Sequence, residues 1–261
     1  MRNSVLTMTE KSSPVQKHSR FATALLDVLD DVEYRRVRLA EQFDPVYRLR
    51  YEAYRREDFV APNSALTVFD EHDEAPNVYC FGVYIKGELV SSIRFHHVTP
   101  KNRISPSGLV FPQALKDMLD QGVSYIDPSR FTADHEATLA YPALPFLTLR
   151  VVAMASEYFD VKYCISSVRV EHAAFYKRVF GSTKMASGGY YPGISFPMDL
   201  YAAEISEIRD RVARRFPFFM STKQERHEFF RGASEGQSFG LISPTARQAQ
   251  VVASEYEKHQ D

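Results

Sequence analysis

The sequence predicts an α/β (α+β) fold in which helices flank a mixed, mostly antiparallel sheet. Two β-rich runs over residues 78–85 and 88–98 meet at a Lys86-Gly87 turn, which is typical of a hairpin. Further strand-like runs alternate with helical segments along the rest of the chain. The most apolar helical segment, residues 145–159, is typical of a helix that covers one face of a sheet.

The other elements follow from the same periodicities. Residues 21–29 have helical spacing of apolar side chains, and residues 32–40 alternate as in a strand. Pro45 fits the first turn of a helix that runs to about residue 56, and residues 58–72 are expected to form an irregular loop. Expected after the hairpin are a helix over 111–119, strands over 123–133 and 161–168, a helix over 171–180 that ends at Gly181, and a last strand over 195–203.

The chain divides into three parts. Residues 1–31 are expected to be an N-terminal tail and helix, and residues 32–204 a main domain with the sheet. Residues 205–261 are charged and helical in character and lack strand signals, so we expect a helical C-terminal extension that is partly disordered. A chain of 261 residues is long enough for one large domain with such an appendage.

Charge and hydropathy exclude several classes of function. The 32 Lys and Arg residues balance 33 Asp and Glu residues, which argues against a nucleic-acid-binding protein. No apolar run approaches the roughly 18 residues of a membrane span, and residues 1–20 lack the apolar core of a signal peptide, so we expect a cytoplasmic protein. The two cysteines, Cys80 and Cys164, lie in apolar strand-like runs and are expected to be buried reduced thiols.

The segment Ile-Asp-Pro-Ser-Arg-Phe at residues 126–131 is the best candidate for an active site. Pro128 has no backbone donor, so it should interrupt the strand and leave backbone N–H groups free to bind a carbonyl oxygen. Asp127 is the candidate base for an attacking amine, or alternatively a helix cap or an ion-pair partner of Arg130. Arg130 could orient Asp127 or bind a substrate carboxylate with its bidentate fork, and an ordinary surface turn is the alternative for the whole segment.

Residues 168–181 carry a second motif, Val-Arg-Val-Glu-His-Ala-Ala-Phe-Tyr-Lys-Arg-Val-Phe-Gly. This segment resembles the end of the GNAT acyltransferase fold, where a helix carries an "AxxFYxxxGF"-like pattern, although Phe180-Gly181 reverses the last pair. The resemblance implies a GNAT-like N-acyltransferase domain. It also implies that Tyr176 could be the acid for a leaving thiolate, with packing in the core as the alternative.

Four blocks in order resemble the acyl-homoserine-lactone (autoinducer) synthases. They are Arg-Leu-Arg-Tyr-Glu-Ala-Tyr at 48–54, Phe-Asp-Glu-His-Asp at 69–73, Ser-Ile-Arg-Phe at 92–95 and the segment at 126–131. The chain departs from those synthases because it has no tryptophan, because its strand acid is Asp127 rather than Glu, and because Pro128 is added. With Leu-Pro-Phe-Leu-Thr-Leu-Arg at 144–150, these departures look closer to the FeeM-like N-acyl amino acid synthases.

That resemblance implies transfer of a long fatty acyl chain from acyl carrier protein to the α-amine of an amino acid, without a cofactor. Within the blocks, Arg50 is a candidate substrate-binding residue. Arg94 could bind a substrate carboxylate, or form a rim salt bridge with Asp70 or Asp73. The two aspartates are candidates for capping or for binding the substrate amine, and no metal is expected there.

The acyl donor is predicted from residues 135–145. This segment has no glycine and two prolines, which argues against a CoA pyrophosphate cradle and for acyl carrier protein, a strongly acidic protein. A basic surface could meet that partner, with Arg35, Arg36, Arg38, Arg150, Lys177 and Arg178 as its candidates. An acyl tunnel could be lined by Phe146, Leu147, Val151, Met154 and Phe175, which are otherwise expected in the core.

Two other functions remain open from the sequence. One is an acyl-homoserine-lactone-type synthase, whose amine substrate is S-adenosylmethionine. The other is a non-catalytic GNAT-fold module that binds acyl chains or a partner through its C-terminal extension.

Overall fold

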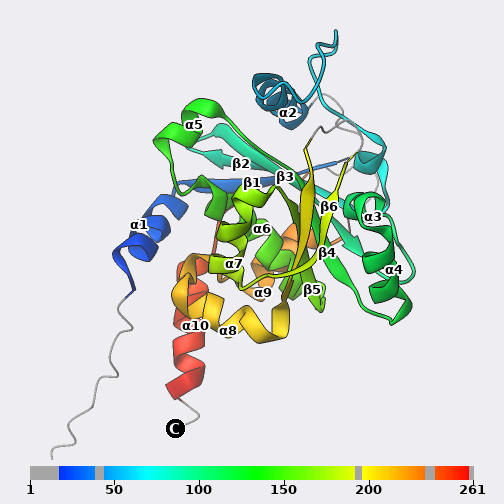
Figure 1. The fold of residues 1–261 in the computed structure, drawn as a ribbon. Helices are drawn as coiled ribbons and strands as arrows, with labels where there is room; N and C mark the ends of the chain where they lie inside the picture. Colours follow the sequence, from blue (N-terminus) through cyan, green and yellow to red (C-terminus); the bar gives the residue numbers. More distant parts are fainter. Residues whose placement is uncertain (1–17, 39–43, 192–195, 233–238, 259–261) are drawn as a thin grey trace, which may run out of the picture.

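The computed structural model describes residues 18–38, 44–191, 196–232 and 239–258. Its strands are β1 (Val32–Val37), β2 (Val78–Ile85), β3 (Glu88–Val98), β4 (Tyr125–Ala133), β5 (Tyr163–Val168), β6 (Thr183–Gly189), β7 (Met198–Glu204) and β8 (Leu241–Ile242). They form one sheet in the order β6-β7-β5-β4-β3-β2-β1-β8 (Figure 1). Strands β4 and β5 pair in parallel and the other neighbours pair antiparallel, which confirms the predicted fold class.

The α-helices are α1 (Arg20–Leu29), α2 (Pro45–Arg56), α3 (Pro106–Val110), α4 (Pro112–Asp120), α5 (His135–Ala140), α6 (Leu144–Tyr158), α7 (Ala173–Phe180), α8 (Ile205–Arg215), α9 (Lys223–Phe230) and α10 (Ala246–Lys258). Short 3₁₀ turns are η1 (Glu71–Glu74), η2 (Val170–His172) and η3 (Pro217–Phe219). Within the described residues, no helix has the length and apolarity needed to cross a membrane.

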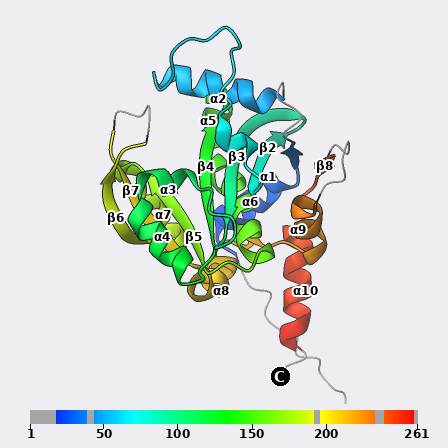
Figure 2. The same cartoon turned by 90° about the vertical axis from the view of Figure 1, so that its right-hand side faces the viewer.

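Helices cover both faces of the sheet (Figure 2). On one face, Tyr125 of β4 shares a buried cluster with Leu115 of α4. On the other, Ile126 belongs to the large cluster that surrounds α6. Because successive side chains of a strand point to opposite faces, Asp127 points toward α3 and α4, whereas Pro128 points toward α6. Asp127 and Pro128 are adjacent in the sequence, but their side chains therefore lie on different faces of the sheet.

Turn and cap positions agree with the sequence. Lys86 and Gly87 both have positive φ angles, 53° and 82°, as the predicted hairpin turn requires. Helix α7 ends at Gly181, which caps it in the left-handed conformation with φ 63°.

The predicted strand over 32–40 is observed as β1, which ends at Val37, and residues 39–43 lie outside the described part of the chain. The predicted last strand begins at Met198 rather than at residue 195, which also lies outside the described residues.

Strand β4 is paired on one side only over most of its length. It pairs with β5 only as far as Ile126 and Cys164, and beyond that pair the described residues offer it no strand partner on this side. The predicted unpaired edge is confirmed, but Pro128 is not the break in the other ladder, because it stays opposite Phe95 of β3. That irregularity is at Arg130, which has a φ of 51° within a β-bulge. We call the opening between β4 and β5 the strand gap.

The C-terminal extension is part of the same core. Arg150 of α6 is buried and donates two hydrogen bonds to Glu225 of α9, at 2.5 and 2.9 Å. It also donates to the backbone oxygens of Phe218 and Met220. The prediction that Arg150 belongs to a basic docking surface is therefore wrong, because its charge is used inside the protein. The extension also adds strand β8 to the sheet, against the expectation of no strand after Glu204.

Candidate active site

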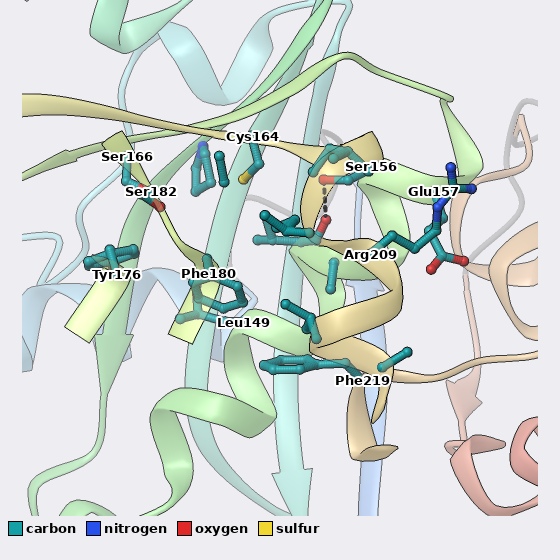
Figure 3. A pocket seen from close by; sticks show the side chains of 18 of the residues that line it. Leu149, Ser156, Glu157, Cys164, Ser166, Tyr176, Phe180, Ser182, Arg209 and Phe219 are labelled. Atoms are coloured by element: carbon teal, nitrogen blue, oxygen red, sulfur yellow. Dashed lines mark hydrogen bonds between the residues drawn. The ribbon is translucent and has the colours of Figure 1, made fainter. Parts of the chain in front are cut away.

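An apolar pocket, partly open to solvent, lies on the α6 side of the strand gap (Figure 3). Pro128 of β4 and the β5 residues Cys164 and Ser166 form the wall next to the gap. Apolar side chains of α6, α7, α8 and η3 form most of the rest, among them Leu149, Val152, Ala153, Phe180, Ile208, Val212 and Phe219. This apolar lining suits an apolar ligand.

The C-terminal extension supplies much of this wall, which the sequence did not predict. The contributing residues are Ile205, Ile208, Arg209, Val212, Ala213, Phe219 and Met220. None of the five predicted tunnel residues lines the pocket. Leu147, Val151 and Met154 are at most 1% exposed and belong to the core, and Phe146 and Phe175 pack against that core, so the alternative interpretation is confirmed.

A chain of alternating charges lies on the opposite face, beneath α2. Arg50 Nη1 donates to Asp73 Oδ1 at 2.8 Å, and Arg94 Nη1 lies 2.9 Å from Asp73 Oδ2. Arg94 Nη1 also donates to Asp70 Oδ1 at 2.5 Å, and Arg130 binds Asp70 Oδ2. We call these residues the arginine–aspartate cluster. Three guanidinium groups face two carboxylates in it, so it carries one excess positive charge.

The cluster brings together the residues predicted to bind substrate. The predicted pairing of Arg94 with Asp70 and Asp73 is confirmed, although Arg94 is buried and not at a rim. Its Nη2 has no hydrogen-bond partner among the described residues. Burial alone would raise the pKa of Asp70, but Arg94 and Arg130 together hold that pKa well below its usual value. Asp70 is therefore a carboxylate at any working pH.

The side chain of Arg130 binds Asp70, and not Asp127 as one of the sequence-based interpretations expected. Its Nε donates to Asp70 Oδ2 at 3.1 Å, and its guanidinium lies 5.4 Å from the ring centre of Tyr54. The possibility that Arg130 orients Asp127 is wrong, because the positive φ at Arg130 and the bulge direct its side chain to the cluster. The alternative role, binding of a substrate carboxylate, is compatible with its position.

Asp127 of β4 is buried, and its carboxylate contacts the start of α3. Its Oδ2 accepts hydrogen bonds from Ser105 Oγ at 2.6 Å and from the Ser107 backbone N–H at 2.9 Å. Its Oδ1 accepts from Ser107 Oγ at 2.6 Å. Burial raises the pKa of Asp127, and these hydrogen bonds oppose the shift in part. The predicted capping contact is thus observed, and it leaves a carboxylate whose affinity for a proton is increased.

Tyr176 lines the pocket, and burial raises its pKa to about 12, so the phenol keeps its proton at neutral pH. Burial also raises the pKa of Cys164 to about 12 and that of Cys80 to about 11. Both cysteines are free. They are therefore neutral thiols as predicted, although Cys164 is only half-buried and borders the pocket.

The basic residues predicted to form one docking surface are dispersed. Arg36 donates to the backbone oxygen of Arg231 at 2.9 Å, so it holds the extension against β1 and is not available to a partner. Arg35 is half-buried in an ion pair with Asp44. Lys177 and Arg178 are exposed on α7, as a docking role requires.

Two serines that complete this site, Ser105 and Ser107, were not predicted from the sequence. A signal was present, because Ser105-Pro106 is a typical start of a helix, with a capping residue followed by proline. Their contact with Asp127 joins segments 20 and 22 residues apart, which periodicity does not detect.

Comparison with known proteins agrees with this geometry. The solved structure of FeeM, an N-acyl amino acid synthase from uncultured soil microbes, has a TM-score of 0.56 and 17% identity over 70% of this chain and 96% of its own. The CoA-dependent acyl-homoserine lactone synthase BjaI has a TM-score of 0.52 and 12% identity over 71% and 89%. Both show the fold, and no curated protein matches the chain. The family model of the N-acyl amino acid synthase FeeM matches residues 45–204. The chain therefore belongs to the FeeM family of N-acyl amino acid synthases and is an acyltransferase that forms N-acyl compounds on a GNAT-like fold.

Proposed function

We propose that the protein moves a long-chain fatty acyl group from an acyl-carrier-protein thioester to the α-amine of an amino acid. One observation carries this proposal. An apolar pocket borders the gap between β4 and β5 on one face of the sheet, and the charged cluster, which includes Arg130 of β4, lies on the other face. An apolar acyl chain and a zwitterionic amine are the two kinds of substrate that such a gap would bring together.

The pocket supports the acyl half of the reaction. Its wall is mainly apolar, and each methylene group that it removes from water contributes about 0.8 kcal/mol. The thioester carbonyl would lie beside Pro128 and Ser166, where the unpaired edge of β4 can offer backbone N–H groups to the oxyanion. Such donors typically contribute about 3–4 kcal/mol to the barrier of acyl transfer.

The arginine–aspartate cluster supports an amino acid as acceptor. Its excess positive charge suits a carboxylate, and the partly exposed Arg130 is the arginine of the cluster that a substrate can reach. The carboxylate of Asp70 is suited to the substrate's ammonium group before that group loses its proton. An amine without a carboxylate would leave the positive charge unmatched.

The chemistry assigns roles to two further groups. Asp127 accepts the proton of the attacking amine, and the raised pKa that burial gives it favours this role. Tyr176 keeps its proton beside the pocket and would protonate the leaving thiolate. A thiolate is a good leaving group, so Tyr176 should matter less than Asp127.

The donor is inferred from α5 and α6. The segment between β4 and α6 is a helix without glycine, and α6 begins with Pro145 within its first two positions, which removes one of the N–H groups that bind phosphates. The exposed Lys177 and Arg178 could steer an acidic carrier protein to the site. Acyl carrier protein as donor would place the reaction in the cytoplasm.

The test is product analysis with purified protein. Long-chain acyl carrier protein and long-chain acyl-CoA are each incubated with a mixture of amino acids or with S-adenosylmethionine, and products are identified by mass spectrometry. We expect an N-acyl amino acid from acyl carrier protein and an inactive Asp127→Asn variant. An acyl-homoserine lactone as the product would contradict the acceptor, and higher activity with acyl-CoA would contradict the donor.

A further inference from the structure

Asp127 cannot take a proton directly from a substrate, because none of its surface is exposed and it does not line the pocket. Its carboxylate oxygens accept hydrogen bonds from Ser105 and Ser107 at the start of α3 and not from a group in the pocket. A buried base of this kind needs an intermediate group that reaches both the carboxylate and the substrate.

Ser107 is such a group, and it connects Asp127 to β5. Its Oγ donates to Asp127 Oδ1 at 2.6 Å and accepts a hydrogen bond from Ser167 Oγ at 2.8 Å. An ionised carboxylate only accepts, so Ser107 must use its single hydroxyl hydrogen toward Asp127. Ser167 must then donate to Ser107, and its own lone pairs are left to accept from another molecule.

Ser167 lies where that other molecule should be. It lies beyond Cys164, the last residue of β5 that pairs with β4, so it lies along the strand gap. It is half-buried, and its neighbour Ser166 lines the acyl pocket from the opposite face. Ser167 therefore faces the side of the sheet on which the arginine–aspartate cluster lies.

We propose that Ser167 and Ser107 form a proton relay from the substrate amine to Asp127. This inference depends on the proposed function, since it assigns a route to the base of that reaction. As the neutral amine attacks the thioester carbonyl, the C–N bond forms and the nitrogen gives a proton to Ser167 Oγ. Ser167 passes its own proton to Ser107, and Ser107 passes its proton to Asp127. The C–S bond then breaks and Tyr176 protonates the leaving thiolate. The proton held by Asp127 returns along the relay to solvent, and Tyr176 regains its own proton from solvent.

The surroundings of Asp127 suit a base that is used reversibly. Arg94 of β3 favours the ionised form, while burial favours the neutral form. Among the described residues, Tyr125 of β4, Cys164 of β5 and Tyr191 also interact with it, and burial raises the pKa of all three, so they stay neutral. His96 of β3 lies opposite Asp127 in the ladder, and burial lowers its pKa to about 3, so it is neutral as well. Asp127 is the group near the relay that changes its charge during the reaction.

The first test compares Ser167→Ala and Ser107→Ala with Ser167→Thr, which keeps a hydroxyl. We expect each alanine variant to lower kcat by about 10²–10⁴-fold, with little change in KM for the amino acid, and Ser167→Thr to keep most of the activity. Wild-type kcat/KM should fall at low pH as the substrate amine and Asp127 are protonated. The part of this acid limb that belongs to Asp127 should disappear in Ser167→Ala, while the part that belongs to the amine should stay. Ser124→Ala is the matched control, because Ser124 is half-buried and precedes the paired part of β4.

The second test is a proton inventory of the wild-type enzyme in mixtures of H₂O and D₂O. A relay moves several hydroxyl protons in one step, so the rate should depend on the deuterium fraction along a curve, whereas a single transferred proton gives a line. A linear inventory would overturn the relay even if an alanine variant did not fold. The relay would also be overturned if the Ser167→Ala variant kept the wild-type acid limb. If Asp127→Asn were inactive in the same experiment, the proposed function would still stand without the relay.

Discussion

Ala213 offers a direct test of whether the C-terminal extension forms the acyl pocket. Ala213 lies on α8, beyond the residues that the family model matches, and its side chain borders the pocket. Ala213→Leu would extend a side chain into the space proposed for the acyl chain. The substitution keeps a good helix former on α8, so the helix itself should be little affected.

The size of the effect follows from the room that is lost. Leucine has about three more carbon atoms than alanine, which displaces roughly three methylene groups of the acyl chain at about 0.8 kcal/mol each. The sum of about 2.4 kcal/mol corresponds to a change of about 60-fold in kcat/KM. Acyl donors shorter by about three methylene groups should be affected little, because they do not reach the filled space. The variant should therefore prefer shorter chains by about this factor.

The assay measures kcat/KM for a series of acyl carrier proteins with increasing chain length. Ala153→Leu, which fills the same pocket from α6, should shift the preference in the same direction. Ala174→Leu is the control, because Ala174 is exposed on α7 and does not line the pocket. A chain-length profile of Ala213→Leu equal to that of the wild type would refute the role of α8 in acyl binding.

Three other outcomes are expected. Arg130→Gln should raise KM for an amino acid by about 10–150-fold, as for a lost hydrogen bond to a charged group, and leave KM for the corresponding amino acid amide unchanged. The control variant Arg48→Gln, on the exposed part of α2, should change neither KM. Glu225→Gln leaves Arg150 buried without its counter-charge and should lower the free energy of unfolding in urea by about 3–5 kcal/mol, a loss that a second change, Arg150→Met, should largely reverse. Because the pKa of Asp70 is lowered in the folded protein, its stabilising contribution is complete above the unfolded-state pKa of about 4 and is lost as the pH falls. Asp70→Asn should therefore make the free energy of unfolding depend less on pH on the acid side.

The sequence predicted those elements whose signals are local. Lys86-Gly87 fixed the hairpin turn, and Gly181 marked the end of α7, because both positions need positive φ angles that glycine favours. Strand β6 was missed because it contains Ser187 and two glycines and is largely exposed, so it has no alternating apolar pattern. Strand β8 was missed because it has only two residues and depends on pairing with β1.

The site was predicted in part, because motifs identify residues but not their partners. The order of the blocks indicated Asp70, Asp73, Arg94 and Arg130, and the structure joins them in one cluster. Nothing local distinguishes the buried Arg150 from an exposed arginine of the same helical pattern, since its partner Glu225 is 75 residues away. The residues that line the pocket could not be predicted either, because apolar side chains around a pocket and in a core have the same spacing along the sequence.

The most direct measurement of the central claim is a crystal structure of the enzyme with a non-hydrolysable acyl-pantetheine analogue. We expect the acyl carbonyl to lie in the strand gap between Pro128 and Ser166, with its chain in the pocket between α6 and α8. A soaked amino acid should place its carboxylate against Arg130, the partly exposed arginine of the cluster on the opposite face. An acyl chain bound on the α2 face, or outside the gap between β4 and β5, would contradict this claim.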